Sequence, residues 1–248
     1  MCKEIKVSIV IPVLNSHEVV RRQIEHFKKM DLPDNIEIIF MDDGSNPPLS
    51  FPDCGLKNFN IYATGDKRPW TECLARNKGA KIAKGEYLLM TDIDHILTRE
   101  LIDAVYKFEG DMMSFPRFLA ILDEEGNFTQ DVEVLFKYGL SRQFYKRRGL
   151  NAGRHGNSFA IRKAIFDEMG GYSERIVARP WHEGADRYFK REWRKRVAVG
   201  KCKPEESGPS IYTFPTGRFC GDGTDIDCNP LGLFNNLKRE MVPQPMLE

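Results

Sequence analysis

The sequence contains no long hydrophobic run. No stretch approaches the ~18 consecutive apolar residues that a membrane-spanning helix needs. A short β-branched run near the start is interrupted by Pro12, and no small-residue cleavage site follows it, so it indicates a buried strand rather than a signal peptide. We therefore expect a cytoplasmic protein without a transmembrane segment.

The sequence also lacks any Cys-x-x-Cys pair. A chain of 248 residues buries a core large enough to fold without a disulfide framework. Free thiols in a reducing compartment are the favoured interpretation, while a bond between Cys220 and Cys228 stays open. The six cysteines are Cys2, Cys54, Cys73, Cys202, Cys220 and Cys228.

The net charge of the chain is close to zero, at a formal value of +1. The distribution is uneven, however. Residues 137–163 contain eight Lys or Arg and no acid, and residues 187–203 contain eight against one Glu. These stretches indicate a basic face, or alternatively two ordinary solvated surfaces.

The first half of the chain alternates β-branched strands with helices. This order predicts an α/β fold in which helices flank a mostly parallel central sheet. Ligands bind such sheets beyond the carboxyl ends of the strands. The expected strands are 6–13, 36–41, 58–63 and 86–90; the expected helices are 16–30, 70–84 (with Gly85 just after its cap) and 98–108.

The second half is less regular. From Gly200 onward the chain is rich in Gly, Pro and Asp, which predicts a long ordered tail or lid over 200–248. Before it, we expect a strand over 112–122, a hairpin turn at 123–127, a basic loop over 139–156, a strand over 157–161, and helices over 163–169 and 183–196.

An Asp-x-Asp pair follows the apolar strand at 86–90. Asp92 and Asp94 can both reach one hard divalent cation such as Mg²⁺ or Mn²⁺, which takes oxygen ligands and neutralises a leaving diphosphate. His95 offers a further nitrogen ligand, and His182 another from a distant segment. A solvated turn is the alternative, but the strand directly before the pair favours the metal site.

A second acidic turn, Asp42-Asp43-Gly44-Ser45, follows the strand at 36–41. Its carboxylates can accept hydrogen bonds from a base N–H or from ribose hydroxyls, and Gly44 permits the tight backbone. A capped turn without a ligand is the equally good alternative.

Five segments of the chain carry a recognisable pattern: Val7–Asn15, Ile38–Asn46, Ala75–Asp94, Gly156–Glu174 and Glu183–Lys195. In this order they resemble the family 2 glycosyltransferases of the GT-A fold, over about residues 7–196. The resemblance implies a GT-A domain over 1–199. Its nucleotide-sugar-binding half would be 1–110, and its less regular acceptor and catalytic half 111–199.

The resemblance also implies site roles. Asp43 would hold the base, Asp92 would face the ribose, and Asp94 would bind the metal. The implied nucleotide-sugar-binding residues are Pro12, Leu14, Asp43, Arg76 (near the diphosphate), Asp92 and Ile93.

The family's later acidic motif usually reads Glu-Asp, and its Asp is the catalytic base. Here Asp186 is present, but Ala185 replaces the Glu, and Glu183 would compensate from one turn earlier. A carboxylate that deprotonates the acceptor hydroxyl opposite the leaving diphosphate implies a single displacement with inversion.

The expected function is therefore a metal-dependent (Mn²⁺ or Mg²⁺) transfer from a UDP-sugar to a glycan or lipid-linked acceptor. Rival hypotheses are a glycosyltransferase for modified nucleic acid, a non-catalytic sugar-nucleotide or nucleic-acid binding module, and a nucleotidyltransferase, which the missing glycine-rich phosphate loop disfavours. For nucleic acid, the basic side chains between 142 and 148 would grip phosphates while Phe144 and Tyr145 stack on bases.

Overall fold

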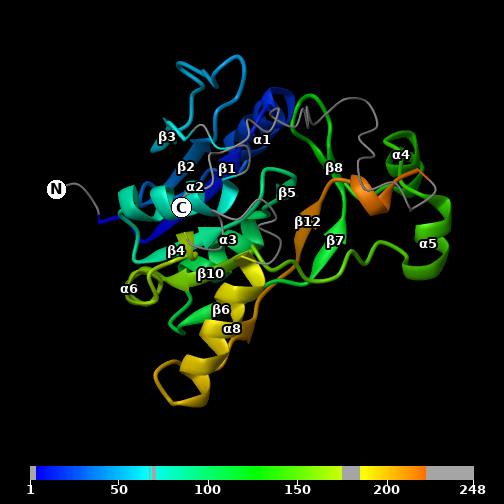
Figure 1. Cartoon of the computed structure of the whole chain (residues 1–248). Helices are drawn as coiled ribbons and strands as arrows, with labels where there is room; N and C mark the ends of the chain where they lie inside the picture. Colours follow the sequence, from blue (N-terminus) through cyan, green and yellow to red (C-terminus); the bar gives the residue numbers. More distant parts are fainter. Residues whose placement is uncertain (1–3, 67, 69–70, 175–184, 222–248) are drawn as a thin grey trace, which may run out of the picture.

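The computed structural model describes residues 4–66, 68, 71–174 and 185–221. A seven-stranded sheet forms the centre, with strand order β11-β6-β10-β4-β1-β2-β3 (Figure 1). The chain is an α/β protein, as expected. No helix of the described ranges has the length and apolar character needed to cross a bilayer.

The first half builds the parallel part of this sheet. β1 (Val7–Val13) pairs in parallel with both β2 (Ile36–Asp42) and β4 (Tyr87–Met90), and β3 (Phe59–Ala63) continues from β2. The connecting helices are α1 (His17–Lys28), α2 (Glu72–Ile82) and α3 (Arg99–Tyr106). These elements match the expected ones to within two residues at each end.

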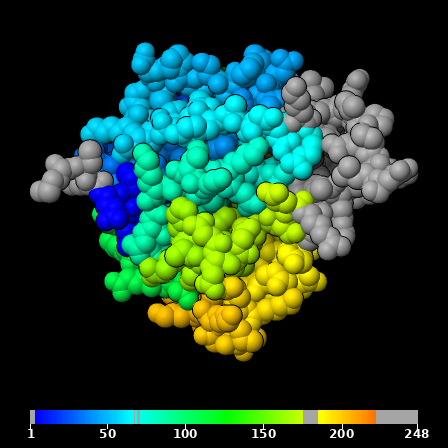
Figure 2. Space-filling model, turned by 60° about the vertical axis from the view of Figure 1, so that its left-hand side comes forward, coloured from blue at the N-terminus to red at the C-terminus, as the bar shows by residue number. Residues whose placement is uncertain are grey.

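Every residue of β1, β2 and β4 is buried because helices cover both faces of the sheet. Alternate strand residues therefore enter different cores. Val7 and Ile9 join the core under α1 and α3, whereas Val10 and Leu88 join the core under α2. α6 (Lys163–Glu168) and α8 (Ala185–Ala198) complete this second face, and Figure 2 shows them beside α2.

The second half adds the antiparallel strand β10 (Phe159–Arg162) between β4 and β6 (Met112–Ser114), and β11 (Glu206–Ser207) pairs with β6. A smaller sheet joins β5 (His95–Ile96), β12 (Ile211–Thr213) and β7 (Arg117–Leu119). Residues after 200 thus supply strands to both sheets. β8 (Ile121–Leu122) and β9 (Phe128–Thr129) pair with each other as a separate antiparallel hairpin.

Three expectations for local structure are wrong. The single strand over 112–122 is three short strands, since Pro116 offers no N–H to a ladder. The basic loop over 139–156 contains the helix α5 (Arg142–Arg148), which Ser141 caps by accepting a hydrogen bond from the Phe144 N–H. α2 ends on an extended Ala83, and Gly85 instead permits close packing, since a Cβ there would lie 2.6 Å from the Ser8 nitrogen.

The remaining short elements are α4 (Val132–Lys137), which the sequence patterns missed, and the 3₁₀ helix η1 (Gly217–Phe219). Cys54, Cys73 and Cys202 are free thiols, as expected. The expectation is wrong for Cys220, which is disulfide-bonded and therefore does not titrate as a thiol.

Candidate functional site

The two acidic turns lie at one edge of the sheet. β1, β2 and β4 run in the same direction, so Asp43 after β2 and the Asp92–Asp94 turn after β4 follow the carboxyl ends of these strands (Figure 1). β5 begins at His95, and the turn therefore also joins the large sheet to the small one.

Asp42 and Asp43 are adjacent but have different partners. The Asp42 carboxylate accepts hydrogen bonds from the backbone N–H groups of Ser45 (2.8 Å) and Leu49 (2.9 Å), so it holds the turn together. Asp43 is 4% exposed and accepts from the hydroxyl of Thr71, at 2.6 and 2.7 Å from its two oxygens. Thr64 donates to it as well, at 3.0 Å. Gly44, with a φ of 94°, makes the turn possible.

The end of β1 lies against this turn. The Asp43 N–H donates to the Val13 carbonyl (2.8 Å), and the Asn15 N–H donates to the Ser45 hydroxyl (2.9 Å). Pro12 is buried in the strand, and Leu14 is half-buried just beyond it. The structure therefore brings Pro12, Leu14 and Asp43 together, as the proposed nucleotide site requires.

Asp92 is the centre of the second turn. One carboxylate oxygen is ion-paired with the Arg76 guanidinium, and the other lies 3.0 Å from His155 Nδ1 and 3.7 Å from His95 Nδ1. Arg76, on α2, is fully buried, and its Nε and Nη1 have no hydrogen-bond partner among the described residues. Arg76 thus contacts Asp92 directly and is not exposed at a surface.

His95 is fully buried and both of its ring nitrogens have protein neighbours. Nε2 lies 3.0 Å from Arg117 Nη1, which can only donate, and Nδ1 lies 2.8 Å from the Ser158 hydroxyl. Burial, with positive charge nearby, holds its pKa well below the usual range. A neutral ring protonated at Nδ1 satisfies these contacts, so a metal at His95 would have to displace Ser158 or Arg117.

His155 is the site residue that sequence reasoning missed. One ring nitrogen of His155, one ring nitrogen of His95 and one carboxylate oxygen of Asp92 all lie within 4.8 Å of one another. Burial lowers the pKa of His155 to about 4, so it is a neutral imidazole at pH 7. Its position follows from strand pairing. Phe159 of β10 pairs with Met90, the last residue of β4, and this brings the segment before β10 to the end of β4.

Asp94 and Asp186 face the same region. Asp94 is half-buried; one of its oxygens lies 3.4 Å from the Thr213 hydroxyl, and no described basic side chain is in ion-pair distance. Asp186, in the first turn of α8, lies so close to Gly156 that a side chain at residue 156 would collide with its carboxylate. Both carboxylates raise the pKa of His155 against the effect of burial.

The residues that the structure brings together are therefore Asp92, Asp94, Asp186, Arg76, His95 and His155. Ile93 is half-buried within the turn, between the two aspartates. Glu183 and His182 lie outside the described residues. Carboxylate oxygens with one neutral imidazole suit Mn²⁺ or Mg²⁺, so the donor set fits the expected ion.

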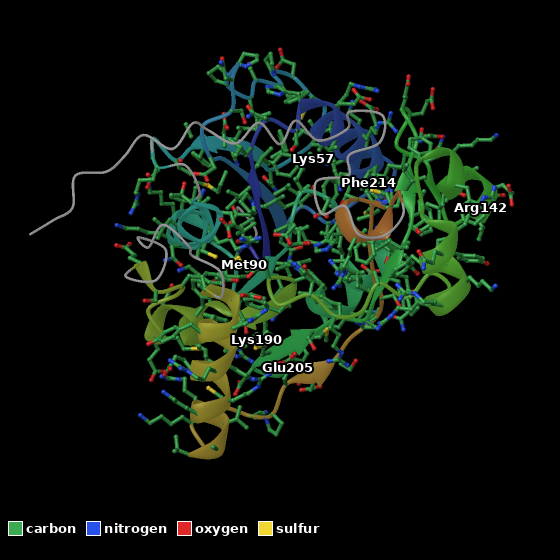
Figure 3. All side chains as sticks on the ribbon, turned by 45° about the vertical axis from the view of Figure 1, so that its right-hand side comes forward. Lys57, Met90, Arg142, Lys190, Glu205 and Phe214 are labelled. Carbon is green, nitrogen blue, oxygen red and sulfur yellow. The ribbon has the colours of Figure 1, made fainter. Side chains whose placement is uncertain are left out.

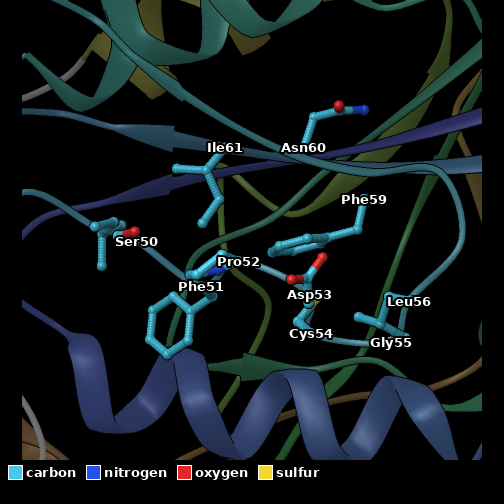
Figure 4. Close-up of a pocket in the computed structure, with 11 residues that line it drawn as sticks. Ser50, Phe51, Pro52, Asp53, Cys54, Gly55, Leu56, Phe59, Asn60 and Ile61 are labelled. Carbon is cyan, nitrogen blue, oxygen red and sulfur yellow. The ribbon is translucent and has the colours of Figure 1, made fainter.

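A separate hollow of about 710 Å³ lies between β3 and the loop from Leu49 to Leu56 (Figure 4). Its charged lining is limited to Asp53, and it contains none of the residues above. It is therefore not part of the acidic site.

The chain resembles known proteins in sequence. The family model described as "Glycosyl transferase family 2" matches residues 8–170, about two thirds of the chain. The glycosyltransferase GlyG of Streptococcus pneumoniae is 30% identical over 41% of this chain and 34% of its own length. The poly(ribitol-phosphate) β-glucosyltransferase of Bacillus spizizenii is 30% identical over 44% of this chain and 18% of its own. The chain thus spans about a third or less of these relatives.

Solved structures share the fold. TarS of S. aureus in complex with UDP-GlcNAc superposes with a TM-score of 0.52 at 17% identity, over 84% of this chain and 58% of that one. The mannosyltransferase PcManGT of Pyrobaculum calidifontis, in complex with GDP-Man and Mn²⁺, gives 0.53 at 15% identity, over 85% and 57%. These likenesses establish the architecture.

Proposed function

The chain belongs to glycosyl transferase family 2, and from this premise we propose that it moves a sugar from a nucleoside diphosphate sugar to an acceptor hydroxyl. The observation that carries the proposal is the meeting of Asp92, Asp94 and Asp186 around His155, beside the buried Asp43 turn. A nucleotide-sugar transfer needs a base-binding group, a metal-binding group and a proton acceptor, and these residues provide one candidate for each.

Asp43 would bind the base of a uridine nucleotide. Thr64 and Thr71 donate to this carboxylate and orient it, and a carboxylate is the acceptor that a base N–H needs. The hydrogen bond from the Asp43 backbone N–H to the Val13 carbonyl holds this residue beside Pro12 and Leu14, which would contact the base. A structural neighbour that contains UDP-GlcNAc supports a uridine donor.

Asp94 would bind a Mn²⁺ or Mg²⁺ ion. Asp92 and His155, whose ligand atoms lie within 4.8 Å of each other and of that of His95, would be further ligands. Such an ion, when bound, neutralises the charge that develops on the leaving diphosphate. Arg76 would keep Asp92 in place through their ion pair and contribute positive charge behind it. A neighbour that contains Mn²⁺ supports this assignment.

Asp186 would take the proton of the acceptor hydroxyl. It reaches the site from the start of α8 and lies against Gly156, whereas Asp92 and Asp94 reach it from the turn after β4, so one carboxylate would serve the acceptor while the others serve the leaving group. This arrangement predicts inversion at the anomeric carbon. Glu183, one turn earlier in sequence, is the competing base, and His182 an additional ligand.

A donor screen tests the proposal. UDP- and GDP-sugars are incubated with the chain and Mn²⁺, release of the nucleoside diphosphate is measured, and the anomeric configuration of a transferred sugar is read by NMR. We expect release from a UDP-sugar and inversion in the product. Release of pyrophosphate, or no turnover of any donor, would show that the chain is not this enzyme.

A further inference from the structure

One polar residue lies on the apolar face of α1. Gln23 is fully buried there, although its neighbours on this face are apolar. Burying an amide is unfavourable unless its polar atoms have hydrogen-bond partners, so the partners of Gln23 indicate its role. Its buried apolar neighbours on the helix are Val19, Val20, Ile24 and Phe27.

Gln23 donates to the two carbonyls on either side of Asp94. Its amide nitrogen lies 3.1 Å from the Ile93 oxygen and 2.7 Å from the His95 oxygen. An amide nitrogen has two N–H groups, and both are used here. The Gln23 Oε1 has no hydrogen-bond partner among the described residues. The hydrogen bonds that the structure shows for this side chain therefore all go to the backbone around Asp94.

This backbone leads into β5, which is an edge strand. The small sheet has the order β5-β12-β7, so among the described strands β5 pairs with β12 alone. On that side, the Phe214 N–H donates to the Asp94 carbonyl (3.0 Å). Figure 1 shows β5 between α1 and β12, and Figure 3 shows the labelled Phe214 in the same part of the molecule as α1 (dark blue). The other edge of β5 therefore faces α1.

Side chains of α1 provide the hydrogen bonds that a further strand would provide. An edge strand presents a row of N–H and C=O groups that lack a backbone partner. Here the carbonyls of residues 93, 95 and 97 have side-chain partners on α1. Gln23 donates to the first two, and His26 Nε2 lies 2.9 Å from the Leu97 oxygen. The backbone on both sides of Asp94 is thus bound to α1.

The Asp94 carboxylate depends on this backbone for its direction. Asp92 is held by its ion pair with Arg76, whereas Asp94 has no described basic side chain in ion-pair distance. The Thr213 hydroxyl lies 3.4 Å from one Asp94 oxygen, which is a weak constraint. Removing a group that orients a metal ligand commonly changes metal affinity or activity about 10–100-fold. A residue that holds the Asp94 backbone can therefore affect metal binding without touching the ion.

We propose that Gln23 is a positioning residue for Asp94, and that its two hydrogen bonds hold this carboxylate in place before an ion binds. The inference rests on the proposed function, in which Asp94 binds the metal. Gln23 acts only through the backbone of Ile93 and His95. Without it, the turn should loosen and Mn²⁺ should bind more weakly, while the nucleotide contacts of Asp43 stay intact.

The test removes the N–H groups of Gln23 and keeps its volume. Gln23→Met has nearly the length of glutamine but no donor, and Gln23→Leu removes the same donor with a different shape. Both must give the same result, which separates the lost hydrogen bonds from a packing defect. The matched control is Gln130→Met. Gln130 also donates to a backbone carbonyl, that of Leu119 at 3.0 Å, but on β7 at the far edge of the small sheet.

Three measurements follow the turn, the metal and the nucleotide separately. Hydrogen exchange of metal-free protein reports on the backbone of residues 91–97, electron paramagnetic resonance of Mn²⁺ with UDP present gives the metal affinity, and calorimetry without metal gives the UDP affinity. We expect both Gln23 variants to exchange faster in this segment and to bind Mn²⁺ about tenfold more weakly, the lower end of the usual effect. The Mn²⁺ concentration for half-maximal UDP release should rise by the same factor. Metal-free UDP affinity should not change, and Gln130→Met should match the wild type throughout.

Wild-type exchange or wild-type Mn²⁺ affinity in both Gln23 variants would overturn the inference, as would the same losses in Gln130→Met. An equal loss of metal-free UDP affinity would also overturn it, because the effect would then be a general one on the fold. If the wild type releases no UDP from any donor while Mn²⁺ affinity still depends on Gln23, the positioning role stands and the proposed function alone is contradicted.

Discussion

At the scale of single residues, neighbours in sequence have separate tasks. Asp42 caps its own turn through Ser45 and Leu49, whereas Asp43 contacts hydroxyls and faces the proposed nucleotide site. The sequence predicted an acidic turn here, but Asp-Asp-Gly-Ser alone does not show which carboxylate serves the fold. The difference depends on Thr64 and Thr71, which are distant in sequence.

Asp43→Ala should weaken UDP binding by about 1–3 kcal/mol, because a buried hydrogen-bond acceptor is lost. The control is Asp42→Asn, which should lower the melting temperature with little effect on the affinity of the protein that remains folded. Isothermal titration calorimetry and thermal unfolding measure the two effects. Unchanged UDP affinity in Asp43→Ala would remove Asp43 from the nucleotide site.

Asp186 is the residue on which the proposed chemistry depends. Asp186→Asn should cut transfer about 10²–10⁴-fold, the usual contribution of a general base, with donor affinity unchanged. Gly156→Ala should also slow transfer, since the added methyl group displaces the Asp186 carboxylate. Glu192→Gln, farther along the same helix, should have no effect. Normal turnover by Asp186→Asn together with an inactive Glu183→Gln would transfer the role to Glu183.

At the scale of elements, burial determined what the sequence could predict. β1, β2 and β4 are continuous apolar segments covered on both faces, so composition alone indicated them. β11 and β12 are short and form by pairing with strands about a hundred residues away, which no local pattern reveals. His155 was missed for the same reason, since its site depends on β10 pairing with β4.

α8 connects packing to chemistry, because it carries Asp186 at its start and buries Trp193 against the second core. Trp193→Ala should cost about 3–5 kcal/mol of unfolding free energy through the cavity it leaves. Arg194→Ala, exposed on the same helix, should stay within about 0.5 kcal/mol. Urea unfolding measures both. A small loss for Trp193→Ala would mean that α8 is not held by this side chain.

At the scale of the whole molecule, the site lies where the two sheets meet. The Asp92–Asp94 turn leads from β4 of the large sheet into β5 of the small one, and Thr213 of β12 lies beside Asp94. The described part of the segment after residue 200, for which the sequence predicted an ordered tail or lid, thus contributes to the site's surroundings. A lid formed by residues 222–248, which lie outside the described ranges, stays a prediction.

The most direct test of the central claim is metal-dependent release of UDP from a UDP-sugar by the wild type, Asp94→Asn and the control Asp103→Asn, an exposed carboxylate paired with Arg99 on α3. We expect Mn²⁺ to support turnover and a chelator to abolish it. Asp94→Asn should lower turnover by at least about a hundredfold, beyond the loss usual for a group that only supports a ligand. Asp103→Asn should behave as the wild type. Full turnover by Asp94→Asn, or by the wild type in excess chelator, would contradict the account.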